Sequence, residues 1–145
     1  MKANYRFLRV KAGKSYFAQL ELNVLPDGNG VTFENASPEK PNVDAGEMNV
    51  HTAPTWVSAA QEAIRDAVDH ARAQGLLPAG CHVRLVKLIG SFVDTRDDVV
   101  RCAAALAAWQ GVGGTEPRPE AEFDGTTWRL LFPASVGSPG SGTSS

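Results

Sequence analysis

Apolar and polar residues alternate along the first part of the chain, as they do in strands that bury one face. "YRFLRV" at residues 5–10 alternates apolar with basic side chains, and "YFAQLELNVL" at 16–25 alternates apolar with polar ones. "PDGNG" at 26–30 is a turn signal, because proline fixes one dihedral angle and glycine allows positive φ. "VTFEN" at 31–35 then predicts a short strand that pairs back across this turn. We therefore predict an antiparallel meander of three strands.

The period changes to that of a helix after residue 53. Apolar side chains recur every three or four positions in residues 54–75, with Pro54 in the first turn and Gly75 at the end. The strand pattern returns in "CHVRLVKLI" at 81–89. The predicted inner face of this first helix is made of apolar side chains: Trp56, Ala60, Ala63, Ile64, Ala67, Val68 and Ala71.

A second helix is predicted from about Arg96 to Gln110. Thr95 stands at the N-cap position, and Asp98 follows three residues later, which resembles a capping box. Its predicted inner face holds a shorter apolar set: Val99, Cys102, Ala103, Leu106 and Trp109.

The remaining segments have weaker patterns. Residues 36–53 read as a long connection with one short extended piece near "EMNVH" at 47–51. "GVGGTEPRPEAEFDG" at 111–125 has the composition of a linker, and "TTWRLLFP" at 126–133 predicts one added strand. "GSPGSGTSS" at the end predicts disorder. We expect one domain over 1–111, a linker with a possible added strand over 112–135 and a disordered tail over 136–145.

This order of elements predicts an α+β fold. Two amphipathic helices would cover one face of a mostly antiparallel sheet and form a two-layer sandwich. The 145 residues, 43% hydrophobic and 21% charged, suit one globular domain with a core that needs no disulfide or metal.

Charge and cysteine content exclude several functional classes. The net charge of −2 argues against a polycation, but the first run of charges is entirely basic, with Lys2, Arg6, Arg9, Lys11 and Lys14 before any acid. The two cysteines form no CxxC pair, the three histidines lack metal-ligand spacing, and no GxxxxGK[ST] phosphate loop occurs. No apolar run is long enough to span a bilayer. We therefore expect a cytoplasmic protein with no metal, cofactor, nucleotide or membrane partner.

Four stretches, taken together, are similar to a known family. They are "GKSYFAQLELNVLPDGNGVTFEN", "WVSAAQEAIRDAV", "GLLPAGCHVRLVKLIGSF" and "DTRDDVVRCAAALAAW", and they extend over roughly residues 5–110. Their order and spacing resemble domain IV of elongation factor G, which has a ribosomal protein S5 domain 2-like fold. The resemblance implies a free-standing relative of the domain whose loops reach the decoding centre and transfer RNA on the ribosome.

The resemblance also implies where the contact loops lie. They correspond to "KAGKSYF" at 11–17 and "IGSFVDT" at 89–95. The family's Gly-Ser-Tyr-His sequence is replaced by Gly90-Ser91-Phe92-Val93, so the histidine is absent. The phosphate loop of a nucleotide-driven factor is also absent, and we expect no GTPase activity from this chain.

Two candidate sites have competing interpretations. The basic N-terminal strand is either an RNA contact, with Tyr16 and Phe17 as stacking surfaces, or a solvated edge that prevents pairing with other chains. The Gly90-Ser91 turn is either an anion site at a helix start or a corner of the fold, and the adjacent acids favour the second. Catalysis by Asp97 and Asp98 is disfavoured, because adjacent helical residues point in different directions.

We therefore expect a non-catalytic binding module that contacts the ribosome or another structured RNA. The alternative is a protein–protein interaction domain that keeps the fold without RNA contact. The expected contact residues are Arg6, Arg9, Lys11, Lys14, Tyr16, Phe17, Ser91, Phe92 and Val93. Cys102 is expected to be a buried, inert thiol, and Trp128 either packs the added strand on the sheet or lies exposed.

Overall fold

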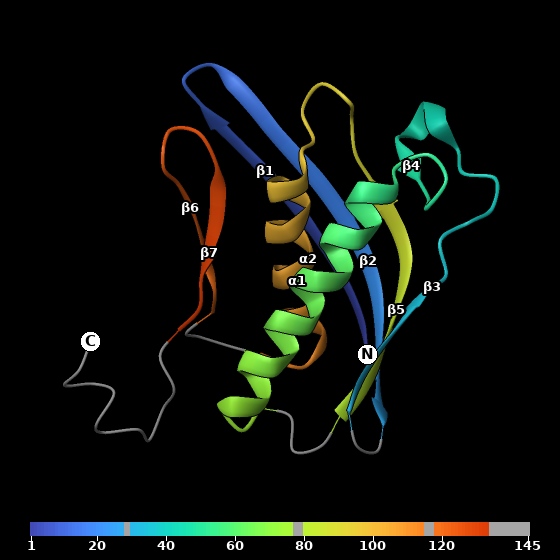
Figure 1. Ribbon diagram of the computed structural model, residues 1–145, viewed down its shortest axis with the longest axis vertical. Coiled ribbons are helices and arrows are strands. Elements are labelled where there is room, and N and C mark those ends of the chain that lie inside the picture. The colour runs from blue at the N-terminus through green and yellow to red at the C-terminus, as the bar shows by residue number, and fades with distance from the viewer. Residues whose placement is uncertain (28–29, 77–79, 115–117, 134–145) are drawn as a thin grey trace.

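The computed structural model describes residues 1–27, 30–76, 80–114 and 118–133, so part of the predicted 26–30 turn and the predicted 136–145 tail lie outside the described residues. The fold is α+β: a sheet carries two helices on one face, and a small hairpin stands beside them (Figure 1). Its elements are β1 (Lys2–Lys11), β2 (Lys14–Asp27), β3 (Val31–Asn35), a 3-10 turn η1 (Val43–Ala45), β4 (Glu47–Met48), α1 (Pro54–Ala73), β5 (Gly80–Ile89), α2 (Asp97–Gly111), β6 (Glu120–Phe123) and β7 (Trp128–Leu131).

The main sheet confirms the predicted two-layer α+β class but corrects its strand order. The order is β1-β2-β5-β3, with β4 also pairing with β5. All pairs are antiparallel except β3 with β5, which is parallel. The predicted β2–β3 meander is therefore wrong. The chain returns through α1 and inserts β5, whose side chains at Cys81, Val83, Leu85 and Leu88 are buried, as the central strand.

The strand alternation separates two faces of the sheet. In β1, Ala3 and Phe7 are buried and the residues between them are more exposed. In β2, every second residue from Tyr16 to Val24 is buried. We call the side under the helices the helix face and the other side the open face. This period of two matches the sequence prediction.

The two helices differ in how much of their surface is buried. α1 buries one side, and its last turns end near Gly75, which has φ +78°. α2 is buried at every position from Cys102 to Trp109, because it packs against β1, β2, α1 and β7. In the described part of the chain, no helix has the length and apolarity needed to cross a membrane.

The segment predicted as a linker contains a strand. β6 pairs antiparallel with β7, with Phe123 opposite Trp128, and the two form a separate hairpin rather than an addition to the main sheet. Trp128 is buried, and its ring packs edge-on against Phe7 at 5.3 Å between centroids. The hairpin therefore covers the side of α2 that the sheet and α1 leave open, as Figure 1 shows.

Candidate functional site at the loop end of the sheet

Two loops form one connected end of the molecule, which we call the tip: residues 11–14 and residues 90–95. The second loop continues along β2 beyond the end of β5. The Phe17 N–H donates to the Asp94 carbonyl at 3.1 Å, and the Thr95 hydroxyl donates to the Phe17 carbonyl at 2.5 Å. These bonds attach the loop at 90–95 to the part of β2 that follows the β1–β2 turn, so the two predicted contact segments, 11–17 and 89–95, are joined through Phe17.

The loop at 90–95 is stabilised by its own hydrogen bonds. The Ser91 N–H donates to Thr95 Oγ1 at 2.8 Å, and the Thr95 N–H donates to the Ser91 carbonyl at 2.8 Å. A Cβ atom at Gly90 would lie 2.8 Å from Thr95 Oγ1 and 2.9 Å from Trp56 Cζ3. Only glycine leaves room for this close approach.

The predicted capping box at Thr95 and Asp98 is wrong. The residue that precedes the first turn of α2 is Arg96, which makes no side-chain cap hydrogen bond. The Thr95 hydroxyl instead donates a hydrogen bond to the Phe17 carbonyl in β2. The Asp98 carboxylate accepts a hydrogen bond from the Trp128 backbone N–H in the β6–β7 hairpin. The sequence presents Thr95 only as a helix signal, and its role in joining the two loops is apparent from the structure alone.

The β1–β2 turn presents two lysines at the tip. Ala12 and Gly13 both have positive φ, 52° and 78°, as a two-residue type I′ hairpin turn requires. Lys11 and Lys14 are paired across this turn and are exposed. The Lys14 ammonium lies 5.5 Å from the centre of the Tyr16 ring.

The other loop presents two apolar side chains. Phe92 is 73% exposed and Val93 is 79% exposed. The Phe92 ring also lies 5.4 Å from the ring of buried Trp56. An exposed apolar pair on an ordered loop is a feature of contact surfaces.

The basic strand does not form one continuous surface. Arg6 lies over the Phe17 ring at 5.6 Å, and β1 alternation places it on the open face. Arg9 lies over the Phe7 ring at 4.5 Å and therefore on the helix face. The run that the sequence predicts as one patch is split between two faces by the pleat of β1. Phe17 is half-buried beneath Arg6.

Tyr16 is not available as a stacking surface. It is only 5% exposed, and its ring packs against Phe123 at 5.4 Å and Trp128 at 5.7 Å. The Arg96 guanidinium lies 5.2 Å from the same ring. The expected stacking of a base on Tyr16 is therefore corrected: the β6–β7 hairpin, of which the sequence predicts only the strand at 126–133, covers this ring.

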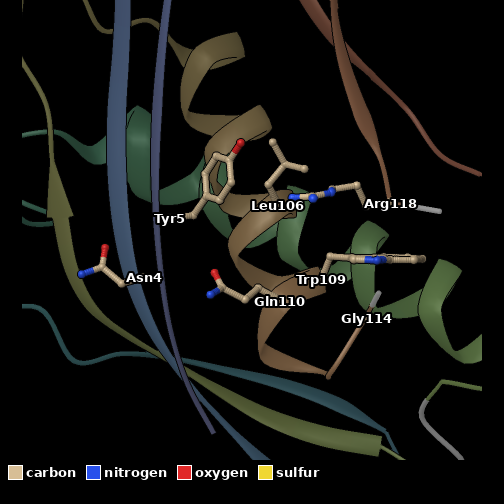
Figure 2. Close-up of a pocket in the computed structure, with 7 residues that line it drawn as sticks. All are labelled: Asn4, Tyr5, Leu106, Trp109, Gln110, Gly114 and Arg118. Atoms are coloured by element: carbon tan, nitrogen blue, oxygen red, sulfur yellow. The ribbon is translucent and has the colours of Figure 1, made fainter. Parts of the chain in front are cut away.

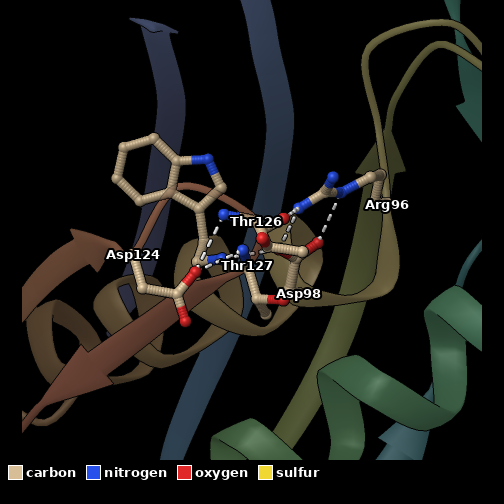
Figure 3. Close-up of polar contacts among 6 residues, drawn as sticks. Arg96, Asp98, Asp124, Thr126 and Thr127 are labelled. Atoms are coloured by element: carbon tan, nitrogen blue, oxygen red, sulfur yellow. Dashed lines mark hydrogen bonds and ion pairs between the residues drawn. The ribbon is translucent and has the colours of Figure 1, made fainter.

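Asp98 is part of a structural cluster rather than a binding site. Figure 3 shows its carboxylate facing the Arg96 guanidinium, with contacts of 3.0 Å from Nε and 2.5 Å from Nη2. The Trp128 backbone N–H donates to Asp98 Oδ2 at 2.7 Å, and the Arg96 guanidinium also donates to the Thr126 carbonyl at 2.9 Å. These contacts attach the hairpin to the start of α2. We call Tyr16, Arg96, Asp98 and Trp128 the hairpin anchor.

Two carboxylates near this end, those of Asp98 and Asp124, have internal partners. Burial raises the pKa of Asp98, but the hydrogen bonds that its carboxylate accepts from Arg96 and from the Trp128 backbone N–H outweigh this effect. The net pKa of Asp98 therefore lies below its usual value. The Thr127 and Thr126 N–H groups lower the pKa of Asp124 (Figure 3). Among the residues described, no three His, Cys, Asp or Glu side chains are grouped as a metal ion requires.

Cys102 lies on the buried surface of α2, as predicted. It is 1% exposed, and burial raises the pKa of its thiol to about 12. A thiol that stays protonated in this environment is a poor nucleophile.

Comparisons with known proteins support the fold alone. No protein-family model matches the sequence, and no curated protein matches it. A crystal structure of a protein from Thermus thermophilus matches with a TM-score of 0.59 and 18% sequence identity. The match covers 75% of this chain but only 15% of the Thermus protein, so the arrangement described above also occurs as a small part of a much longer chain.

Proposed function

We propose that this chain is a non-catalytic binding module that contacts the ribosome or another structured RNA through the tip. The observation that carries the proposal is that loop 90–95 is hydrogen-bonded, through Asp94 and Thr95, to Phe17 of β2, the strand that begins at the β1–β2 turn. The tip presents two ammonium groups at the β1–β2 turn and two exposed apolar side chains on the other loop. In the described part of the chain, neither Lys11 nor Lys14 has an ion pair, so both are free to neutralise phosphates.

The resemblance to domain IV of elongation factor G supports the same assignment. Both tip loops fall in the stretches that carry the resemblance, at 11–17 and 89–95. We propose that this chain is a relative of that domain and acts where translation takes place. The Thermus structure supports the fold described above and carries neither the relationship nor the function, because fold alone does not specify activity.

The assignment as a binding module rather than an enzyme is also a proposal. It is supported by the polar groups near the tip, which already have structural roles. Thr95 joins the loops, Asp98 binds Arg96, and the Cys102 thiol is buried. A general base or nucleophile needs a free partner within hydrogen-bonding distance of a substrate.

Charge reversal at the tip tests the RNA contact. We expect Lys11→Glu/Lys14→Glu to weaken co-sedimentation with ribosomes by about tenfold or more at low salt, and by less as salt rises. Lys2→Glu/Lys40→Glu makes the same change in net charge at exposed positions outside the tip and serves as the matched control. Equal binding by the tip variant and wild type would remove the RNA role.

The exposed Phe92 and Val93 favour a second candidate, a protein–protein interaction domain that uses the same tip. A protein partner would bury these side chains, whereas RNA would mainly engage the lysines. Capture of a purified ribosomal fraction before and after nuclease treatment separates the two. Capture that survives nuclease and moderate salt favours the protein partner.

A further inference from the structure

β1 forms an outer edge of the main sheet, and its backbone register shows which groups face outward. Among the strands that the structure describes, β1 pairs with β2 alone. The Val24 N–H donates to the Met1 carbonyl at 2.8 Å, and the Met1 amino group donates back to the Val24 carbonyl. In an antiparallel pair, the backbone N–H and carbonyl groups of successive residues point alternately toward and away from the partner strand. Those of the odd-numbered residues of β1 therefore bond to β2, and those of the even-numbered residues point outward.

Two other contacts agree with this register. Phe17 stands opposite Leu8 and directs its own N–H and carbonyl to Asp94 and Thr95, away from β1. The Arg9 guanidinium donates to the Leu8 carbonyl at 3.1 Å, a contact that an outward carbonyl allows. The outward backbone groups of Asn4, Arg6 and Val10, together with the Leu8 N–H, therefore form an edge to which another strand can pair once the Arg9 side chain leaves the Leu8 carbonyl.

A trough runs beside this edge on the helix face. Figure 2 shows one part of it, a hollow of about 470 Å³ lined by β1 and α2 residues that include Tyr5 and Leu106, with Arg118 at its rim. A second hollow of about 360 Å³ shares these three residues and extends to Arg9. The trough follows β1 from Asn4 to Arg9, a length of about 17 Å for strand geometry.

The apolar and charged side chains of this trough indicate which kind of ligand it can bind. Tyr5, Leu106 and Trp109 give the trough an apolar wall, while Arg9 and Arg118 add positive charge to its lining. Lys2 and Arg6 lie on the other side of the same strand. Among the described residues of this edge and its lining, Lys2, Arg6 and Arg9 outnumber the one acid, Glu120, so the described part of this surface is basic.

We propose that an extended acidic peptide segment of a partner protein pairs with the outer edge of β1. Its backbone would match the alternating N–H and carbonyl groups, and alternate side chains would enter the trough. Two copies of this chain paired through β1 would bring the Lys2 and Arg6 side chains of both copies onto one face of the joined sheet, which disfavours self-association. RNA has no backbone repeat of donors and acceptors to match a strand edge. This surface is separate from the tip, so the proposal does not depend on the RNA contact.

Amide hydrogen exchange followed by NMR tests the pairing directly. The probe is an eight-residue peptide of alternating Glu and Val, and the control probe has Lys in place of Glu. We expect the acidic peptide to slow exchange at the outward amides of Asn4, Arg6 and Leu8, and to leave the already paired Tyr5 and Phe7 unchanged. No added protection at saturating peptide overturns the proposal. So does equal protection by the lysine peptide, by single-stranded RNA, or by raising the protein concentration alone.

A pair of variants at one position separates backbone pairing from side-chain charge. Arg6→Ala removes the guanidinium and keeps the outward N–H, whereas Arg6→Pro removes both. Proline is tolerated on an edge strand where the N–H is not in the ladder. We expect Arg6→Pro to bind the acidic peptide about threefold to tenfold more weakly than Arg6→Ala. Equal affinities in folded variants, with Tyr5 and Phe7 still protected, overturn strand pairing, and the wild-type exchange result decides the question if Arg6→Pro does not fold.

Discussion

The hairpin anchor and the tip both combine cations with aromatic rings, but only the tip leaves them open to a partner. In the hairpin anchor, the Arg96 guanidinium is occupied by Asp98 and the Thr126 carbonyl, and Tyr16 is covered by Trp128. In the tip, Lys11 is exposed and Phe92 has one ring contact below it. Basic and aromatic composition alone therefore does not identify a binding surface. Internal partners decide whether such residues stabilise the fold or remain available.

This comparison predicts opposite consequences for substitutions in the two regions. Changes in the hairpin anchor should lower stability and leave the affinity of the folded protein for RNA unchanged. Changes at the exposed side chains of the tip, Lys11, Lys14, Phe92 and Val93, should lower affinity and leave stability nearly unchanged.

The largest expected effect on stability is that of Trp128→Ala. Removing this buried ring takes away its contacts with Phe7, Tyr16 and Phe123 and should lower the free energy of unfolding by about 3–5 kcal/mol. Urea denaturation measures the loss, with Trp128→Phe as the control that keeps a ring in place. A loss below about 1 kcal/mol for Trp128→Ala would show that the hairpin is not part of the core.

Asp98→Asn should have the next largest effect. Removing the charge weakens the hydrogen bonds from Arg96 and the Trp128 N–H and should cost about 1.5–3 kcal/mol near neutral pH. Asp97→Asn, at the exposed neighbouring position, changes the same charge outside the hairpin anchor and should cost about 0.3–1 kcal/mol.

The contribution of Asp98 should also depend on pH with a defined sign. Its pKa is lower in the folded protein than its usual value of 3.8, so its stabilisation is fully present above that value. It is lost as the pH falls through the lowered pKa, and the wild type should then approach the stability of Asp98→Asn. A difference between them that stays constant from pH 7 to pH 2 would contradict this.

Phe92→Ser/Val93→Ser should have the smallest effect on stability. Both side chains are mostly exposed, so the free energy of unfolding should change by less than about 0.5 kcal/mol. Binding to ribosomes should nevertheless fall if these residues lie in the contact. Wild-type affinity in the double variant would show that Phe92 and Val93 do not contribute to ribosome binding.

The sequence predicts each helix and most strands because their apolar periods are regular. It does not predict the partner of β3, because a turn signal after β2 reports a reversal of the chain and not which strand fills the next position. It also misses β6, since "EAEF" lies in a segment rich in Gly, Pro and Glu. One signal was available: α2 is apolar around most of its circumference, and such a helix needs a cover on more than one side.

The candidate site is predictable only in part for a related reason. The two loops are apparent from turn residues and from the resemblance, whereas their connection through Thr95 and Phe17 joins positions 78 residues apart in the sequence. Arg6 and Arg9 lie on opposite faces, and their spacing of three already implies this once β1 is known to be a strand. The burial of Tyr16 follows from the hairpin, of which sequence reasoning predicted the second strand and missed β6 and the pairing.

The most direct test of the account is the salt dependence of RNA affinity. Lys11→Gln/Lys14→Gln removes two cations from the tip without adding acids, and Lys2→Gln/Lys40→Gln makes the same change elsewhere. On purified ribosomal RNA, the tip variant should reduce the slope of log affinity against log salt by about 2 relative to wild type, while the control keeps most of that slope. An equal slope for wild type and the tip variant would contradict an RNA contact at the tip.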